Sequence, residues 1–561
     1  MKSLKLLLFS LLSGLLLFAA WPPSGIPFVT FFAFIPFLFI SDAIEEDKLR
    51  FPFLKALLFS YPGLLLWNVL TTWWIWNSTP EGSVAAFLLN ALLMATIFGM
   101  GQWFRRHIKG FFPFALFFIS LWISFEYLHL QWDLSWPWLH LGNAFASLTQ
   151  YVQWYEFTGV FGGTLWILGA NFLFYYWIKS LKESKRKKRI SMISATLWFI
   201  VPIVVSMIIF YQYEPKEENP IEVIIVQQNT DPWEEQYTMA NVQHTERIME
   251  VAYPYLTPET QLIVSSESSI PHTINSDKLI RRAYKTELNL YNPYCGFVLM
   301  DSLLARHPNL NIIAGLSTRS IYDDKATPTA RQLPNGKFED LFNSSICYNR
   351  KGVTGIYHKS RLVPGVEKMP FPKIFGFLEN LVIDLGGPSG SLGVDYIQKA
   401  FPTSILNGSC KIGVPICYES IYGEIFSHFV ADGASLMAVI TNDAWWGNTP
   451  GHKQHFLYAK LRAIETRRTI LRAANTGFSG IINEKGEVVS KTRYEERTAI
   501  RAKVYPNDKI TFYVKYGDYI ASLGLSVFSL LFIWVLYVIF SKNKSPEFLK
   551  KIRKKYSRIT S

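Results

Sequence analysis

Long apolar stretches occupy most of the first 212 residues and recur once near the carboxyl end. A bilayer core needs about 20 mostly apolar residues for each helix that crosses it. Eight segments reach or approach this length, so the pattern predicts eight transmembrane helices. They lie at about 5–21, 26–42, 53–75, 84–104, 111–130, 159–181, 191–212 and 519–541.

The first segment has a second interpretation. Lys2 and Lys5 precede an apolar run that ends at Ala19-Ala20, which is also the pattern of a secretory signal peptide. The apolar run resumes directly after Pro22-Pro23. This continuation favours a helical hairpin made of the first two segments.

Basic residues are confined to alternate loops. The loops near 22–25, 77–83 and 131–158 contain no Lys or Arg, whereas those near 43–52, 105–110 and 179–190 do. The tail after residue 541 adds eight more basic residues. Because cytoplasmic loops carry the excess of Lys and Arg, we expect both termini in the cytoplasm and residues 213–518 outside it.

The composition separates the same two parts of the chain. Fourteen of the 18 Trp lie in residues 1–212, and charged residues make up only 18% of the chain. An ordinary soluble protein has about 25%. The net charge of +13 gathers in short runs between apolar stretches, which suits a membrane face better than a nucleic-acid groove. No nucleic-acid partner is therefore expected.

Residues 213–518 alternate short strand-like runs with helix-like stretches, which is typical of a layered α/β domain. One helix is expected over 231–255, and an amphipathic helix over 454–473 with its basic residues on the outer face. A hairpin is expected over 345–358. Further apolar runs predict strands at 221–226, 261–264, 311–316, 411–415 and 436–441.

The four cysteines do not form a recognisable metal or disulfide pattern. Cys295, Cys347, Cys410 and Cys417 include no C-x-x-C, and four are too few for a disulfide scaffold. Whether any two of them are joined stays open. His452 and His455 lie one turn apart without an evident third ligand, so neither a metal nor another cofactor is expected.

Three strand ends carry side chains that can divide one acyl-transfer reaction among them. Glu267 follows the run QLIV, Lys359 follows GIYH, and Cys417 follows KIGVPI. Open α/β sheets place their sites at strand ends. A thiol can act as nucleophile, a carboxylate can take its proton, and an ammonium can stabilise the oxyanion. Taken singly, a strand Cys more often packs in a core, and a Glu or Lys at a strand end is more often a solvated rim residue.

Together these residues resemble the carbon–nitrogen hydrolase (nitrilase) superfamily, in which a Glu–Lys–Cys triad lies at strand ends of an αββα sandwich. Longer segments are similar to the apolipoprotein N-acyltransferase family within it. These are SWPWLHLGN at 135–143, HKSRLVPGVE at 358–367, ICYESIYGE around Cys417, TNDAWWG at 441–447 and the stretch 454–477. The arrangement of eight spans, with a domain inserted before the last, is similar too.

The resemblance implies roles for seven residues. Glu267 would be the general base, Lys359 the oxyanion partner and Cys417 the nucleophile. The other positions that the family needs correspond to Trp233, Glu367, Tyr418 and Glu419. This chain departs from the family in reading VPGVE for the usual VPFGE and SSESSIP around Glu267, and QQNTDPW is shorter than usual before Trp233.

The resemblance also implies the architecture, a polytopic α-helical membrane protein with an inserted nitrilase-like αββα sandwich. Residues 1–212 would form seven transmembrane helices and residues 213–518 the extracytoplasmic catalytic domain. Residues 519–541 would form the eighth helix, and 542–561 a basic cytoplasmic tail. The location implied is a bacterial inner membrane, with the catalytic domain on the periplasmic side.

The reaction implied is the last step of bacterial lipoprotein maturation. Cys417 would take a fatty acyl chain from a phospholipid as a thioester, without a cofactor. The α-amino group of the S-diacylglyceryl-cysteine of an apolipoprotein would then accept the chain. The enzyme is expected to be a monomer.

Two other functions compete with this one. A membrane-tethered nitrilase or amidase would use the same triad on a C–N bond of a soluble substrate, with water as the second acceptor. A transporter with an accessory domain would need ionisable residues inside the spans, and apart from Glu126 few are present.

The stretch Met369–Leu392 lies between Glu367 and Cys417 and combines clustered Phe residues with Pro and Gly at its ends. We expect a mobile arm, hinged near Gly386-Gly387, whose Phe375 and Phe377 dip into the outer leaflet and guide acyl chains. A buried helix of the sandwich is the alternative.

Overall fold

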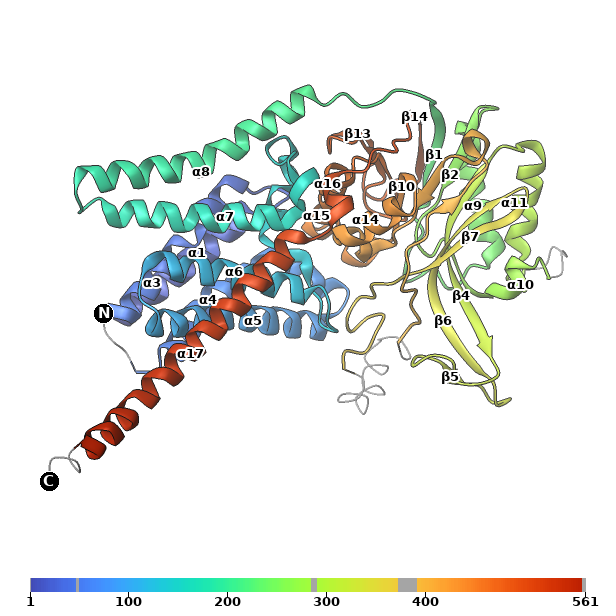
Figure 1. The fold of residues 1–561 in the computed structure, drawn as a ribbon. Coiled ribbons are helices and arrows are strands. Elements are labelled where there is room, and N and C mark those ends of the chain that lie inside the picture. Colours follow the sequence, from blue (N-terminus) through green and yellow to red (C-terminus); the bar gives the residue numbers. More distant parts are fainter. Residues whose placement is uncertain (1, 47–49, 284–289, 372–390, 557–561) are drawn as a thin grey trace.

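The computed structural model describes residues 2–46, 50–283, 290–371 and 391–556. In this part, eight segments are helical, long and apolar enough to cross a membrane, and the chain is a multi-pass membrane protein. Seven precede the α/β part and one follows it (Figure 1). The helices that build them are α1 (Lys2–Ala20), α2 (Thr30–Ala33), α3 (Ile35–Glu46), α4 (Pro52–Thr72), α5 (Pro80–His107), α6 (Phe111–His129), α7 (Tyr155–Ser180), α8 (Lys185–Gln212) and α17 (Tyr519–Tyr556).

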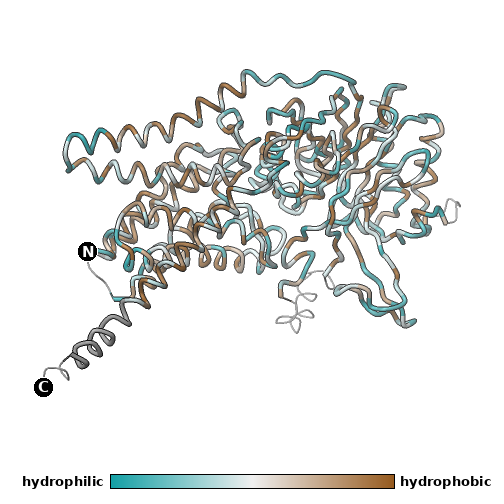
Figure 2. Tube along the Cα trace, viewed as in Figure 1, coloured by the Kyte–Doolittle hydropathy of each residue, from teal (hydrophilic) through white to brown (hydrophobic). Residues whose placement is uncertain are grey.

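Two of these helices are apolar on nearly all sides yet have few protein neighbours. Only 11% of the apolar window is buried in α8, and the same share in α17. Figure 2 shows hydrophobic residues along the helical part and a mixed pattern in the α/β part. A helix that is hydrophobic all round must be buried in protein or in lipid, so the bilayer is the solvent that these side chains require.

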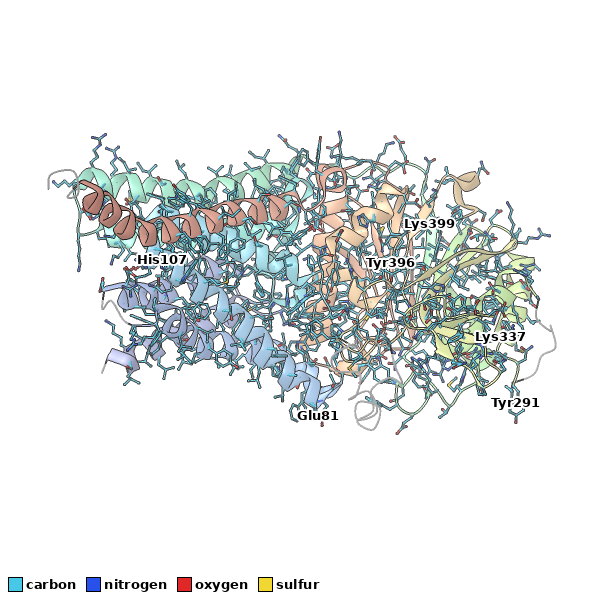
Figure 3. All side chains as sticks on the ribbon, turned by 60° about the horizontal axis from the view of Figure 1, so that its bottom comes forward. Glu81, His107, Tyr291, Lys337, Tyr396 and Lys399 are labelled. Carbon is cyan, nitrogen blue, oxygen red and sulfur yellow. The ribbon has the colours of Figure 1, made fainter. Side chains whose placement is uncertain are left out.

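The basic loops lie at the end of the bundle that is remote from the α/β part. In Figure 3, Glu81 at the start of α5 lies beside the α/β part, and His107 at the end of α5 lies far from it. The loop after His107 contains Lys109, whereas the loop before Glu81 contains no basic residue. The charge asymmetry of the sequence therefore follows the long axis of the molecule.

The α/β part contains two sheets. The first has the order β14 (Thr498–Val504), β1 (Ile221–Gln227), β2 (Thr260–Val264), β4 (Asn311–Tyr322), β6 (Phe338–Asn349) and β5 (Arg331–Gln332), with β3 (Ile270–Asn275) on β4 and β7 (Gly352–His358) on β6. The second has the order β13 (Val488–Lys491), β12 (Gly480–Ile482), β11 (Ile470–Ala474), β10 (Ala434–Thr441), β9 (Lys411–Gly413) and β8 (Phe401–Pro402). The predicted hairpin of β6 and β7 is confirmed.

Alternation along β1 explains the layering. Ile224 and Val226 pack in one core with α9 (Asn241–Ala252) and α11 (Cys295–Arg306), whereas Val223 and Ile225 pack in the other with β9 and β10. Side chains two apart on a strand share a face, so one strand serves two cores. The second sheet is covered by α14 (Gly423–Ala431) and α15 (Pro450–Thr466), and α15 also contacts α7. This is the expected αββα order, set on the membrane helices.

Two expected helices are wrong in extent. The first begins only at Asn241, because residues 231–239 form turns. The second ends at Thr466, where Arg467 takes a left-handed conformation (φ 49°), and the chain continues as β11. The prediction that its basic residues lie on an outer face is also wrong, because the second sheet and the membrane helices enclose this segment. The buried side chains include Arg462, Arg467, Arg468 and Arg472.

Arg467 joins the α/β part to the helical bundle. Its guanidinium donates from Nε to Glu156 Oε2 at 2.8 Å and from Nη1 to Gln153 Oε1 at 2.8 Å. Glu156 lies at the start of α7, and Arg467 is fully buried. A buried pair of this kind holds two elements in one relative position because neither charge can be left without its partner.

Replacing Arg467 with Met should lower the free energy of unfolding by about 3 kcal/mol, because the Glu156 carboxylate is then buried beside only the more distant Lys509. The measurement is the melting temperature of the purified protein in detergent. Lys216→Met is the matched control, since Lys216 pairs with Glu218 on the surface. If the melting temperature falls as little in Arg467→Met as in Lys216→Met, this account is wrong.

Candidate active site

The stacking of the two sheets brings three strand ends together. Glu267 follows β2, and Lys359 directly follows β7, both in the first sheet. Cys417 begins a short 3-10 turn, Cys417–Ile421, that follows β9 in the second sheet. Lys359 Nζ lies 3.3 Å from Glu267 Oε1, and the charges of both groups act on the Cys417 thiol.

Lys359 is buried between two carboxylates. Its Nζ lies 2.8 Å from Glu367 Oε1 and 3.3 Å from Glu267 Oε1, and its side chain is 1% exposed. Burial alone would lower the pKa of Lys359, but the negative charges of Glu267 and Glu367 outweigh it and hold the pKa well above its usual range. The side chain is therefore a permanent ammonium, suited to stabilise an oxyanion.

Two asparagines that were not among the seven predicted site residues hold the carboxylates in place. Asn343 Nδ2 donates to Glu267 Oε1 at 2.7 Å and to Glu367 Oε1 at 3.0 Å. The backbone N–H of Asn442 donates to Glu267 Oε2 at 3.0 Å. The role of Asn343 could have been inferred from the predicted hairpin, because Asn343 in β6 lies directly across from Lys359. The backbone carbonyl oxygen of Asn343 accepts a hydrogen bond from the N–H of Lys359 at 2.8 Å.

Cys417 occupies a strained position. Its φ of +49° lies in the left-handed region, which is uncommon for a residue other than glycine. Burial, and after it the charge of Glu267, raise the pKa of the Cys417 thiol well above its usual range, although Lys359 opposes them. The group is therefore a neutral thiol, and a thiol of this kind needs a base in order to act as a nucleophile.

Glu419 ties the Cys417 turn to the Lys359 loop. Its carboxylate accepts from the backbone N–H of Ile416 at 2.7 Å and from that of Ser360 at 2.7 Å, and also from the hydroxyl of Tyr357. Glu419 is fully buried, and burial raises the pKa of its carboxyl. With both oxygens engaged by these donors, Glu419 is placed to position its neighbours rather than to exchange a proton with substrate.

A buried ionic network lies next to Cys417. His455 Nε2 lies 3.1 Å from the carbonyl oxygen of Cys417 and 2.8 Å from Ser420 Oγ. Its Nδ1 lies 2.9 Å from Asp443 Oδ1, and Arg472 Nη2 lies 2.7 Å from Asp443 Oδ2. Although burial opposes ionisation, Arg472 and His455 hold the pKa of Asp443 well below its usual range. Through His455, the network holds the backbone of Cys417 in place.

An apolar cavity of about 250 Å³ opens beside Cys417. Its wall combines α5, which belongs to the membrane part, with residues 134–138 and 363–366 and with Trp446. Tyr418 also lines it, and the Tyr418 hydroxyl donates to the carbonyl oxygen of Ser135 at 2.7 Å. Cys417 thus lines a space that the membrane helices help to form.

Comparison with known proteins assigns both parts of the chain. Residues 13–173 match the apolipoprotein N-acyltransferase N-terminal domain, and residues 223–508 match the carbon-nitrogen hydrolase family. The chain belongs to the apolipoprotein N-acyltransferase family. It is accordingly an acyltransferase, and the family expected from its motifs is confirmed.

Similar proteins cover nearly the whole chain. The apolipoprotein N-acyltransferase of Chlorobaculum tepidum is 26% identical over 535 residues, covering 93% of this chain and 95% of that protein. The one from Geobacter metallireducens is 26% identical over 528 residues, covering 92% of each. Among solved structures, Saccharomyces cerevisiae Nit3, a member of branch 10 of the nitrilase superfamily, is 17% identical and covers 52% of this chain and 92% of its own, with a TM-score of 0.35.

Two expected parts of this acyltransferase's site are exposed at the surface or lie outside the described residues. Trp233 is 68% exposed and packs edge-on against Trp445, with ring centroids 4.9 Å apart, on the loop that carries Asn442. Most of the expected arm, including Phe375, Phe377 and the glycine hinge, lies outside the described residues. Its two described ends meet, since Met369 N–H donates to Ser391 Oγ at 3.1 Å.

The four cysteines are free and buried.

Glu267→Gln should make Cys417 more reactive towards iodoacetamide while making the enzyme less active. Removing a negative charge lowers the pKa of the Cys417 thiol, so more thiolate is present at any pH below that pKa. We expect alkylation at about pH 8 to be roughly tenfold faster, measured by intact mass.

Two further variants control this test. Lys359→Met removes a positive charge and should slow the alkylation of Cys417. Glu246→Gln, on the exposed face of α9, should leave it unchanged. Slower alkylation in Glu267→Gln would overturn the electrostatic account.

Proposed function

We propose that this enzyme transfers a fatty acyl chain from a phospholipid to the α-amino group of the S-diacylglyceryl-cysteine of an apolipoprotein, through a thioester on Cys417. The observation that carries this proposal is the apolar cavity that runs from membrane helix α5 to Cys417. A soluble substrate does not require an apolar cavity that the membrane helices help to form. Transfer to an amine is therefore favoured over hydrolysis of a soluble C–N substrate.

In the first step, Glu267 takes the proton of the Cys417 thiol as its sulfur attacks an ester carbonyl of the phospholipid. The ammonium of Lys359 stabilises the negative charge that develops on the carbonyl oxygen. The C–O bond of the ester then breaks, and Glu267 returns the proton to the departing oxygen. The products of this step are the thioester and a lysophospholipid.

In the second step, the α-amine of the apolipoprotein attacks the thioester carbonyl. Glu267 takes a proton from the amine, an amide bond forms, and the C–S bond breaks. The proton returns to the sulfur of Cys417. No oxidant, metal or cofactor enters the balance.

The four supporting residues act by position. Glu367 holds the second side of Lys359, and Glu419 fixes the turn of Cys417 against the loop of Lys359. Tyr418 joins the nucleophile's turn to the membrane part. Trp233 packs against Trp445 of the loop 441–447, which also carries Asn442.

Cys417→Ala should abolish the acyl mass that the enzyme gains on incubation with phospholipid, and Lys359→Ala should reduce it by at least about a hundredfold. The measurement is the intact mass of the purified protein, followed by transfer to a diacylated lipopeptide. Both variants should still insert in the membrane, because neither residue lies in a span. Lipopeptide acylation by Cys417→Ala at the wild-type rate would overturn the mechanism.

For the orientation, we propose cytoplasmic termini and a periplasmic α/β part, on the evidence of the basic loops at the remote end of the bundle. Single cysteines placed at Glu246 and at Lys187 should then be labelled by an impermeant reagent from opposite sides of the membrane. Labelling of the Lys187 position from the periplasm of intact cells would reverse the topology.

A further inference from the structure

Two residues that line the apolar cavity beside Cys417 have buried polar atoms without hydrogen-bond partners within the described part of the chain. His129, the last residue of α6, lines the cavity and is 4% exposed, and its Nε2 has no hydrogen bond to any described residue. Asn90 of α5 also lines it, and its Oδ1 is unpartnered in the same part of the chain. These atoms suggest an occupant that carries polar groups as well as hydrocarbon.

The neighbours of His129 fix which of its nitrogens carries the proton. The indole Nε1–H of Trp132 donates to His129 Nδ1 at 2.8 Å. An indole N–H can only donate, so Nδ1 must accept, and the proton of the neutral ring lies on Nε2. The unpartnered atom is therefore an N–H donor that lacks an acceptor.

The ring is also held in one orientation. Phe125 stacks on it, with centroids 5.2 Å apart and an interplanar angle of 22°, while Trp132 holds the Nδ1 edge. A buried donor without a partner destabilises a fold, and in native structures each such group calls for an explanation. A fixed donor in the wall of a ligand cavity is explained when the ligand supplies the acceptor.

We propose that His129 Nε2–H donates a hydrogen bond to an oxygen of the glycerol backbone region of the acyl donor, either the second ester carbonyl or the phosphate. The inference rests on the proposed function, with the reactive ester at Cys417 and its chain in the cavity. An acyl chain has no acceptor to offer, and the apolipoprotein, whose diacylglyceryl esters are also acceptors, enters only in the second step. His129 thus distinguishes a glycerolipid from a simple fatty ester.

The experiment measures thioester formation alone, without apolipoprotein, so that the diacylglyceryl group of the acceptor cannot take part. The probes are phosphatidylethanolamine, a diacylglycerol with the same chains, and the p-nitrophenyl ester of the same fatty acid. The rate at which Cys417 gains acyl mass is compared in wild type, His129→Leu and His129→Gln, since Gln keeps an N–H donor.

In His129→Leu, the ratio of the phosphatidylethanolamine rate to the nitrophenyl ester rate should fall by about 3- to 10-fold. His129→Gln should restore most of this ratio. If diacylglycerol loses as much as the phospholipid, the acceptor is the ester carbonyl, and if it does not, the acceptor is the phosphate. An unchanged ratio in His129→Leu, or a Gln variant no better than Leu, overturns the proposal.

Trp132→Phe provides a second test that does not depend on the folding of His129→Leu. Phe keeps a ring beside His129 but cannot donate to Nδ1, so the proton is free to move there and the same ratio should fall. A ratio equal to that of wild type would contradict the assignment of the donor. If wild type gains no acyl mass from any probe, the proposed function fails instead, and the outcome is recognisably different.

Discussion

A buried ammonium between two carboxylates sets the conditions for the rest of the site. Lys359 has lost its water, and a charge removed from water must be compensated by partners in good geometry. Glu267 and Glu367 supply the compensating charge, and Asn343 bonds to both of them. The charges of Glu267 and Lys359 also act on the Cys417 thiol, so the contacts that make the burial of Lys359 tolerable also give the arrangement that the proposed reaction needs.

The membrane part contributes to this arrangement through α15. Gln454 of α15 accepts from the indole N–H groups of Trp74 and Trp138 and donates to the carbonyl oxygen of Pro22. Arg467 bonds to Glu156 of α7 at the carboxyl end of the same helix. The helix is therefore a shared wall, with the second sheet on one side and the transmembrane bundle on the other. Movement of the bundle relative to the sheets would disturb the cavity and the turn of Cys417 together.

Most of the fold could be predicted from the sequence because its signals are local. Apolar runs of sufficient length mark the spans, and short apolar runs followed by Glu267, Lys359 and Cys417 mark the strand ends. The errors arise where the surroundings decide. Arg462 of α15 and Arg472 of β11 were predicted to lie on a solvated basic face because a sequence does not reveal that this segment is covered on both sides.

The partners of the site were harder to predict for the same reason. Asn343 acts across a hairpin and Asn442 acts through its backbone, so residue type alone gave no indication of either role. The unpartnered donor of His129 depends on a tautomer that Trp132 selects. Properties of this kind belong to the packed structure, and a pattern of residues along the chain does not contain them.

The suppressed ionisation of Cys417 has a consequence for the lifetime of the enzyme. Oxidants attack thiolates far faster than thiols, and access to solvent increases the damage. Outside the cytoplasm, where the proposed topology places the α/β part, no glutathione pool restores an oxidised cysteine. In the proposed mechanism the buried sulfur loses its proton only when substrate arrives, so oxidants seldom meet a thiolate between turnovers. The weak acidity of the Cys417 thiol therefore also protects the enzyme from oxidation in an oxidising compartment.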